Sequence, residues 1–264
     1  MIRDLKKQTP VLLLAVILSV FVGGFVSAVQ AQGGPPMITD DPGTPGNGMW
    51  EVNFLASIDH TRSGSFFETP LADINYGVGK RLQLKFEVPL VALKEHDENA
   101  KFGLGNSKFG IKYRFLDEEK NGVDMSIYPQ LEFNNPTRSV ERGLADRGMV
   151  LTLPLEIVKK VGPVEVNPEV GYEMTQYGKD TVFFGVAVGR QISKRVEFAA
   201  EIHGDALRDF KEKVIVANFG TRLKLSDKVG LMFSAGHTIR TPTGDEPHFI
   251  AAFGIQFNFK GKVH

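Results

Sequence analysis

Apolar and polar residues alternate along almost the whole chain after residue 49. From Trp50 onward, apolar residues such as Val52 and Phe54 take every second position, with polar residues between them. This period of two indicates β-strands with one face in an apolar environment. Such runs recur twelve times, at 50–59, 72–78, 82–88, 109–115, 123–133, 149–157, 164–172, 182–188, 196–202, 215–225, 229–235 and 249–259. The pattern therefore predicts an all-β fold of about 12 strands.

The connections between these runs differ in length in a regular way. Short basic turns such as 79–81, 193–195 and 226–228 alternate with longer linkers. An even number of antiparallel strands, with short periplasmic turns and longer outer loops, is typical of outer-membrane barrels. We expect the longer outer loops at 59–68, 89–103, 134–147, 174–180, 203–212 and 239–247.

A soluble β-sandwich would also bury one face of each strand, so alternation alone leaves that alternative open. The polar face, however, keeps charged residues such as Lys85, Lys112 and Glu169 in mid-strand, as a wet lumen allows. Aromatic residues, among them Trp50 and Phe259, fall where membrane interfaces would lie. We therefore predict a single antiparallel transmembrane β-barrel over residues 50–264, in contact with a lipid bilayer.

The first 31 residues have the features of a cleaved signal peptide. A short basic region precedes the apolar run 11–22, and small residues follow at Ala28 and Ala31. Cleavage after Ala31 is expected, with Ala28 as the alternative. A membrane anchor is the other interpretation, but the run is shorter than the ~20 residues that a spanning helix needs. The chain is thus expected in the outer membrane of a Gram-negative-type bacterium.

Residues 32–49 form a leader rich in proline and glycine. Proline lacks a backbone donor, so a helix or a central strand is excluded here. We expect this periplasmic leader to fold back against or into the barrel mouth. There Asp40 and Asp41 would pair with inward bases such as Lys112 or Arg114 and could form a gate. The alternative is a simple export spacer.

Charge and residue types exclude several functions. The 31 basic and 31 acidic residues balance and are interspersed, which argues against a nucleic-acid partner. The chain has no cysteine, and no pair of histidines has metal-ligand spacing. The Asp40–Asp41 pair lacks the further oxygen ligands that calcium requires. We expect neither a metal nor a cofactor.

The inward faces of the predicted strands are unequal. Strands at 182–188, 229–235 and 249–259 turn mainly small or apolar residues inward, such as Gly185 and Gly254. That side could hold a plug segment, form a path for apolar ligands, or be a plain polar pore wall. The predicted lumen-lining residues are Glu51, Asp73, Lys85, Glu87, Lys108, Lys112, Arg114, Asp124, Glu132, Glu169, Phe183 and Met232.

Four segments resemble a known bacterial family. They are "PPMITDDPGTPGNGMWEVNF" at 35–54, "GLGNSKFGIKYRF" at 103–115, "YPQLEFNNPT" at 128–137 and "FIAAFGIQFNF" at 249–259. They are similar to segments of the family named for the MetA-pathway of phenol degradation, also labelled transporter. The resemblance implies an outer-membrane barrel and the uptake of aromatic or other hydrophobic compounds, and it supplies no catalytic residues. Barrels of this kind often end on an aromatic residue, whereas "KGKVH" follows Phe259 here.

The pattern favours a channel or carrier for passive passage of small, including hydrophobic or aromatic, molecules, and not an enzyme. Two alternatives remain. His60, His203 and His237 are predicted near the outer rim, where a hydrolase or lipid-modifying enzyme would need a base, an orienting acid and a nucleophile. A structural or adhesive barrel with a closed lumen is the other.

Overall fold

The structure, a computed structural model, describes residues 34–208, 210, 213–241 and 248–261. The predicted signal peptide at 1–31 lies outside the described residues. A single sheet contains the described strands: β1 Met49–His60, β2 Gly64–Val78, β3 Leu82–Glu95, β4 Lys101–Leu104, β5 Ser107–Leu116, β6 Asp124–Ile127, β7 Gln130–Phe133, β8 Val150–Val161, β9 Val164–Thr175, β10 Thr181–Gln191, β11 Val196–Leu207, β12 Lys213–Lys224, β13 Val229–Arg240 and β14 Phe249–Lys260.

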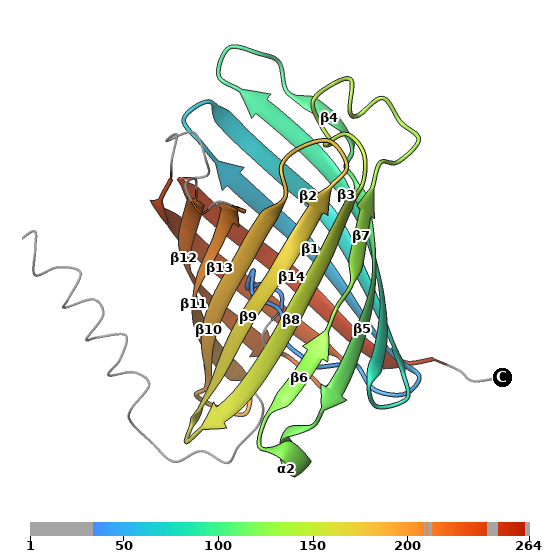
Figure 1. Cartoon of the computed structure of the whole chain (residues 1–264), viewed down its shortest axis with the longest axis vertical. Coiled ribbons are helices and arrows are strands. Elements are labelled where there is room, and N and C mark those ends of the chain that lie inside the picture. The colour runs from blue at the N-terminus through green and yellow to red at the C-terminus, as the bar shows by residue number, and fades with distance from the viewer. Residues whose placement is uncertain (1–33, 209, 211–212, 242–247, 262–264) are drawn as a thin grey trace, which may run out of the picture.

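The sheet closes on itself as an antiparallel barrel (Figure 1). β1 pairs with β14 along its full length, from Met49 opposite Lys260 to His60 opposite Phe249. β4 and β5 both pair with β3 and form one barrel strand, which is interrupted at 105–106. β6 and β7 likewise form one strand, interrupted at 128–129, between β5 and β8. The prediction of a twelve-stranded barrel is therefore confirmed.

The barrel is apolar outside and charged inside. Phe54 and Phe233 on the outer face are 46% and 42% exposed, whereas Lys112 and Glu156 on the inner face are 2% and 0% exposed. This reverses the arrangement of a water-soluble domain, in which charged residues are almost never fully buried. Lipid requires such an apolar outer surface, and strand closure satisfies the backbone hydrogen bonds.

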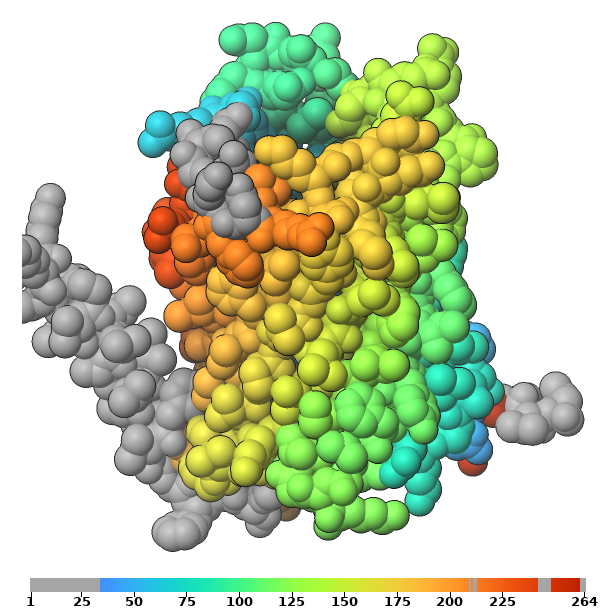
Figure 2. All heavy atoms as spheres, in the orientation of Figure 1, coloured from blue at the N-terminus to red at the C-terminus, as the bar shows by residue number. Residues whose placement is uncertain are grey.

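Several outer loops are shorter than the sequence pattern predicts. The linker expected at 59–68 is wrong, because β2 begins at Gly64 and pairs with β3 up to Glu95. In Figure 1 the start of β2 and the end of β3 rise above the other strands, and Figure 2 shows the connection between β3 and β4 beside the loop that follows β7. Beyond the membrane both faces of a strand meet water, so backbone pairing continues there without alternating side chains. The long connection at 134–149 remains, between β7 and β8.

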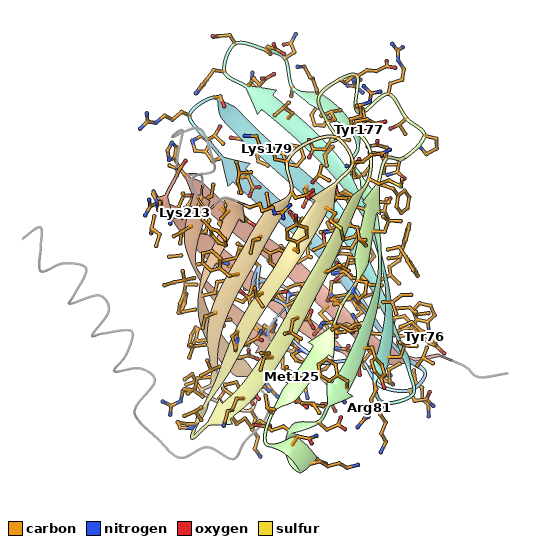
Figure 3. The ribbon with its side chains drawn as sticks, viewed as in Figure 1. Tyr76, Arg81, Met125, Tyr177, Lys179 and Lys213 are labelled. Carbon is orange, nitrogen blue, oxygen red and sulfur yellow. The ribbon has the colours of Figure 1, made fainter. Side chains whose placement is uncertain are left out.

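The two ends of the barrel differ. The turn end carries the connection 79–81 and the one-turn helix α2, Glu118–Asn121; the loop end is the opposite one. Tyr76 and Arg81 lie at the turn end, and Tyr177, Lys179 and Lys213 at the loop end (Figure 3). The Trp50 ring lies 4.6 Å from the Tyr76 ring, between centroids. The described part of the chain has no helix that is long and apolar enough to cross a membrane.

Turn-end charges pair with one another. Arg81 donates a hydrogen bond to Asp117, which lowers the pKa of that carboxyl group. Arg114 Nε lies 3.3 Å from Asp117 Oδ1, and its guanidinium donates to the Lys80 carbonyl at 2.9 Å. These pairs hold α2 against the end of the barrel.

Candidate functional site

The leader described from residue 34 lies inside the barrel, where it appears in blue between the strands of Figure 1. Thr39, near its middle, is 0% exposed. The leader reaches β1 along the turn end, where Gly48 N donates to Gly77 O at 2.9 Å and Gly79 N donates to Asn47 Oδ1 at 2.9 Å. Residues 34–48 are called the leader below.

Local turns give the leader its compact shape. Gly34 N donates to Thr39 O, and Met37 N donates to Gly34 O, both at 2.9 Å. The Asp41 carboxylate accepts a hydrogen bond from Gly43 N at 2.5 Å, an Asx-type turn that aspartate favours. With four prolines among its residues, the leader cannot add a strand to the barrel, so it packs by means of its loop and side-chain contacts.

Lys112 is the main charged contact of the leader. Its Nζ lies 3.1 Å from Asp40 Oδ1 and 3.2 Å from Glu156 Oε2, and it donates to the Asp41 carbonyl. It also lies 4.5 Å from the centroid of the Tyr128 ring, within cation–π range. One buried ammonium group thus joins the leader to β5, β8 and the Tyr128 position.

Carboxylates on the other side of the lumen bind the leader backbone. Glu201 accepts hydrogen bonds from Ile38 N and Thr39 N, each at 2.8 Å. Glu169 accepts one from Asp40 N at 3.3 Å, and Asn167 Nδ2 donates to Asp40 O at 2.7 Å. Backbone groups that would otherwise be buried without partners are satisfied in this way.

Arg222 on β12 binds the first described residues. It donates to Gly34 O at 2.7 Å and to Pro35 O at 2.8 Å, and its guanidinium lies 3.0 Å from Glu197 Oε1. This guanidinium therefore links the leader to a carboxylate of β11.

Two glycines of the wall make room for the leader. A Cβ added at Gly185 would collide with the Thr39 hydroxyl, and one added at Gly220 would collide with the end of the Met37 side chain. Gly254, by contrast, faces Leu55 and Met232. The sequence left three interpretations of the side with small inward residues: a plug segment, a path for apolar ligands or a plain polar pore wall. The contact between Gly185 and Thr39 fits a plug segment.

The other predicted lumen residues form a second charged group. Lys85 pairs with Glu87 and lies 3.7 Å from Asp73, and Lys108 lies 3.7 Å from Glu87 and 4.0 Å from Glu132. All five side chains lie on the inner face of β2, β3, β5 and β7.

The remaining predicted lumen-lining residues lie at different levels along the barrel axis. Glu51 accepts a hydrogen bond from Asn53 at 3.2 Å, and Phe183 and Met232 are buried at 6% and 1% exposure. Asp124 accepts from Glu118 N at 2.8 Å, at the turn end.

Two of the expected leader contacts need correction. Arg114 binds the turn end and not the leader, because it lies two residues closer than Lys112 to the turn end of β5. The Asp41 side chain closes a local turn, and only its carbonyl contacts Lys112.

Sequence reasoning missed several residues that hold the leader, namely Tyr128, Glu156, Asn167, Glu201 and Arg222. All occupy inward positions in the alternating pattern, so the pattern could have marked them as lumen residues. The pattern could not have shown which of these residues lie at the same level along the barrel axis. That level depends on how far neighbouring strands are staggered around the barrel.

Cavities of the lumen lie on both sides of the leader. The loop-end cavity measures about 480 Å³ and lies between the leader and the 134–149 loop. The turn-end cavity measures about 230 Å³. Gly34, Pro35, Asp40 and Lys85 line both, so the leader and the Lys85 ion pairs lie between them.

The histidines considered for catalysis do not form a triad. His60 Nδ1 lies 2.9 Å from Ser65 Oγ, His237 Nδ1 lies 2.6 Å from the Thr238 carbonyl, and His203 Nε2 lies 3.7 Å from Asp205 Oδ1. The expected rim position of His203 is wrong, because this residue is 6% exposed and points into the lumen beside Phe183. None of the three, as far as the described residues show, contacts both a hydroxyl and an acid. Nor do the described residues include a cluster of three or more potential metal ligands.

No family model matches the chain, and no curated protein matches it either. Solved structures do match. An outer membrane channel from Pseudomonas putida F1 aligns with a TM-score of 0.66 at 12% identity, over 89% of this chain and 100% of that one. The chain has the fold of an outer-membrane channel. The KdgM porin shares this channel fold with a TM-score of 0.57 at 10% identity, over 79% of this chain and 99% of its own. The NanC porin does so with a TM-score of 0.56 at 8% identity, over 80% of this chain and 100% of its own.

Proposed function

We propose that the chain forms an outer-membrane channel for passive passage of small solutes, closed in its resting state by the leader. The observation that carries this proposal is the position of the leader between the two cavities of the lumen, where Lys112, Glu201 and Arg222 bind it. An export spacer would need none of these contacts. The leader is joined to β1 at only one of its ends, so it can leave the lumen without breaking the barrel.

The outer membrane is the proposed location. The exposed apolar residues of the outer face match what a lipid bilayer requires, and the solved structures that share the fold are outer-membrane proteins. A signal peptide at 1–31 would direct export. The leader then starts from the periplasmic side, which is the turn end of the barrel.

The proposed solutes include hydrophobic or aromatic molecules. Leu55, Phe66 and Leu71 give the loop-end cavity an apolar side, and the resemblance to the family named for the MetA-pathway of phenol degradation points the same way. A cavity of about 480 Å³ falls within the ~300–1,000 Å³ typical of small-molecule sites.

Conductance across planar bilayers tests the channel proposal. Mature protein should conduct weakly, and deletion of residues 33–48 should increase the conductance several-fold, because the two cavities then join. Different gel mobility of unboiled and boiled samples verifies that both proteins are folded barrels. If neither folded protein conducts, the channel proposal is wrong; if both conduct equally, the leader does not close the lumen.

A further inference from the structure

The loop-end cavity is enclosed on its outer side by a fixed loop. Leu144 of the 134–149 loop is 1% exposed and lines the cavity. Asn106 Nδ2 donates to Asp146 O at 3.1 Å and to Glu132 Oε1 at 2.9 Å. The loop is thus tied to the interruption between β4 and β5, and with the leader it bounds a chamber for one small molecule.

The two sides of this chamber differ in chemistry. Leu55, Phe66 and Leu71 of β1 and β2 present an apolar side, whereas the charged side consists of Lys85, Glu87, Lys108 and Glu132. Pockets that are mainly apolar with a few polar groups orient a ligand by its polar end. The chamber therefore suits an amphipathic molecule.

The charges of the chamber favour a cation. Five carboxylates and two ammonium groups line it, so acids outnumber bases even though Asp40 is also paired with Lys112. Both ammonium groups are already paired, Lys85 with Glu87 and Lys108 between Glu87 and Glu132. An anion would meet carboxylates here and would find no unpaired lysine among the described residues that line the chamber.

Two carboxylates that line the chamber, Glu68 and Asp146, are free to bind, and Glu68 is the one that lies on a barrel strand. Within the described part of the chain the Glu68 side chain makes no hydrogen bond or ion pair. Phe66, two residues earlier on the same strand, lines the chamber too, because side chains at i and i+2 share a face. A carboxylate beside an aromatic ring is the combination that recognises organic ammonium ions.

We propose that this chamber binds small organic cations in which an ammonium group is joined to an apolar, preferably aromatic, body. The ammonium group pairs with Glu68, and the body packs against Phe66 and Leu71. This inference rests on the proposed channel function, since it names the class of solute that the channel would admit.

Two permanently charged probes with the same ring test the inference: benzyltrimethylammonium and benzenesulfonate. Calorimetry on the folded mature protein in detergent measures binding, and flux out of protein-containing liposomes measures passage. We expect the cation to bind and pass at least about tenfold better than the sulfonate. Glu68→Gln should weaken cation binding roughly fivefold or more, whereas the matched control Glu119→Gln, an exposed acid on α2, should leave it unchanged.

A second variant keeps the test decisive if Glu68→Gln fails to fold. Phe66→Leu keeps an apolar side chain but removes the ring, so it should weaken binding of benzyltrimethylammonium, and a different gel mobility of its unboiled and boiled samples verifies that it is a folded barrel. Equal binding of both probes, or equal binding by Glu68→Gln and Glu119→Gln, would overturn the cation site. Cation binding without any ion conductance would instead overturn the channel function and leave the site standing.

Discussion

Among the residues of the lumen, Lys112 is the one whose replacement should destabilise the protein most. Its side chain is 2% exposed, and its two carboxylate partners, Asp40 and Glu156, come from the leader and from β8. Burial of an ammonium group is costly unless its partners are close and well placed. The arrangement therefore ties the barrel wall and the leader together through one shared ammonium group.

Replacing this ammonium group should destabilise the protein strongly. Lys112→Met leaves Asp40 and Glu156 facing each other without a counter-charge, and breaking a buried pair costs about 3–5 kcal/mol. The free energy of unfolding, measured by urea titration in lipid or detergent, should fall by that order. Lys120→Met, at an exposed position of α2, is the control and should have little effect. A loss below about 1 kcal/mol for Lys112→Met would mean that the lumen is wetter than the contacts imply.

The substitution Gly77→Ala tests where the leader runs at the turn end of the barrel. A Cβ at this position would collide with the Gly46 carbonyl, which is backbone and cannot rotate away, whereas Gly230 has 3.7 Å of space. The chain has no cysteine, so Thr39→Cys supplies a single thiol inside the lumen. Gly77→Ala should speed maleimide labelling of that thiol roughly tenfold, the factor expected from ~1–3 kcal/mol of overpacking. Gly230→Ala should label like the parent, and equal rates for all three proteins would place the leader elsewhere.

At the level of elements, alternation predicted the strands but not their ends. All twelve runs became barrel strands, because lipid on one side and water on the other impose a period of two on the side chains. Where β2 and β3 continue past the membrane to Gly64 and Glu95, that constraint is absent and the pattern gives no signal. The interruptions at 105–106 and 128–129 were also missed. The first lies outside the run predicted at 109–115, and the second leaves Ile127 and Leu131 on the same outer face, so the alternation does not reveal it.

The sequence predicted the type of site, a leader held by charged lumen residues, but only some of its individual contacts. The prolines of the leader excluded a helix or strand, and the expectation that Asp40 and Lys112 would meet matches the distance of 3.1 Å between them. Partners such as Glu201 and Arg222 depend on the stagger between strands and on the depth that the leader reaches. Sequence position alone fixes neither quantity.

The hydrogen bonds of Asn135 should hold the 134–149 loop in place. Asn135 Nδ2 donates to Gly105 O at 2.6 Å and to Ser107 Oγ at 3.0 Å, across the interruption between β4 and β5. Asn135→Ala leaves both acceptors without this donor, at a cost of about 1–3 kcal/mol, and amide hydrogen exchange in 134–149 should become faster. Asn99→Ala, at an exposed position of another outer connection, should leave that exchange unchanged. Unchanged exchange in Asn135→Ala would show that the loop is fixed by other contacts.

At the scale of the whole molecule, the described residues form a closed barrel wall with the leader inside its lumen. Backbone pairing makes the barrel complete without the leader, because β1 and β14 pair directly. The leader contributes polar contacts to the lumen and no strand to the wall. The proposed closure of the lumen and the folding of the barrel therefore depend on different parts of the chain.

A disulfide that fixes the leader tests this account most directly. Thr39 Cβ lies 3.3 Å from the position of a Cβ at Gly185, close to the ~3.5–4.5 Å of a disulfide, so Thr39→Cys combined with Gly185→Cys can lock the plug in the lumen. The account predicts that bilayer conductance of the oxidised double variant is lower than that of the parent and rises when reductant is added. Each single-cysteine variant should not respond to reductant. Equal conductance of the double variant in its oxidised and reduced forms, with the disulfide verified by mass spectrometry, would contradict closure by the leader.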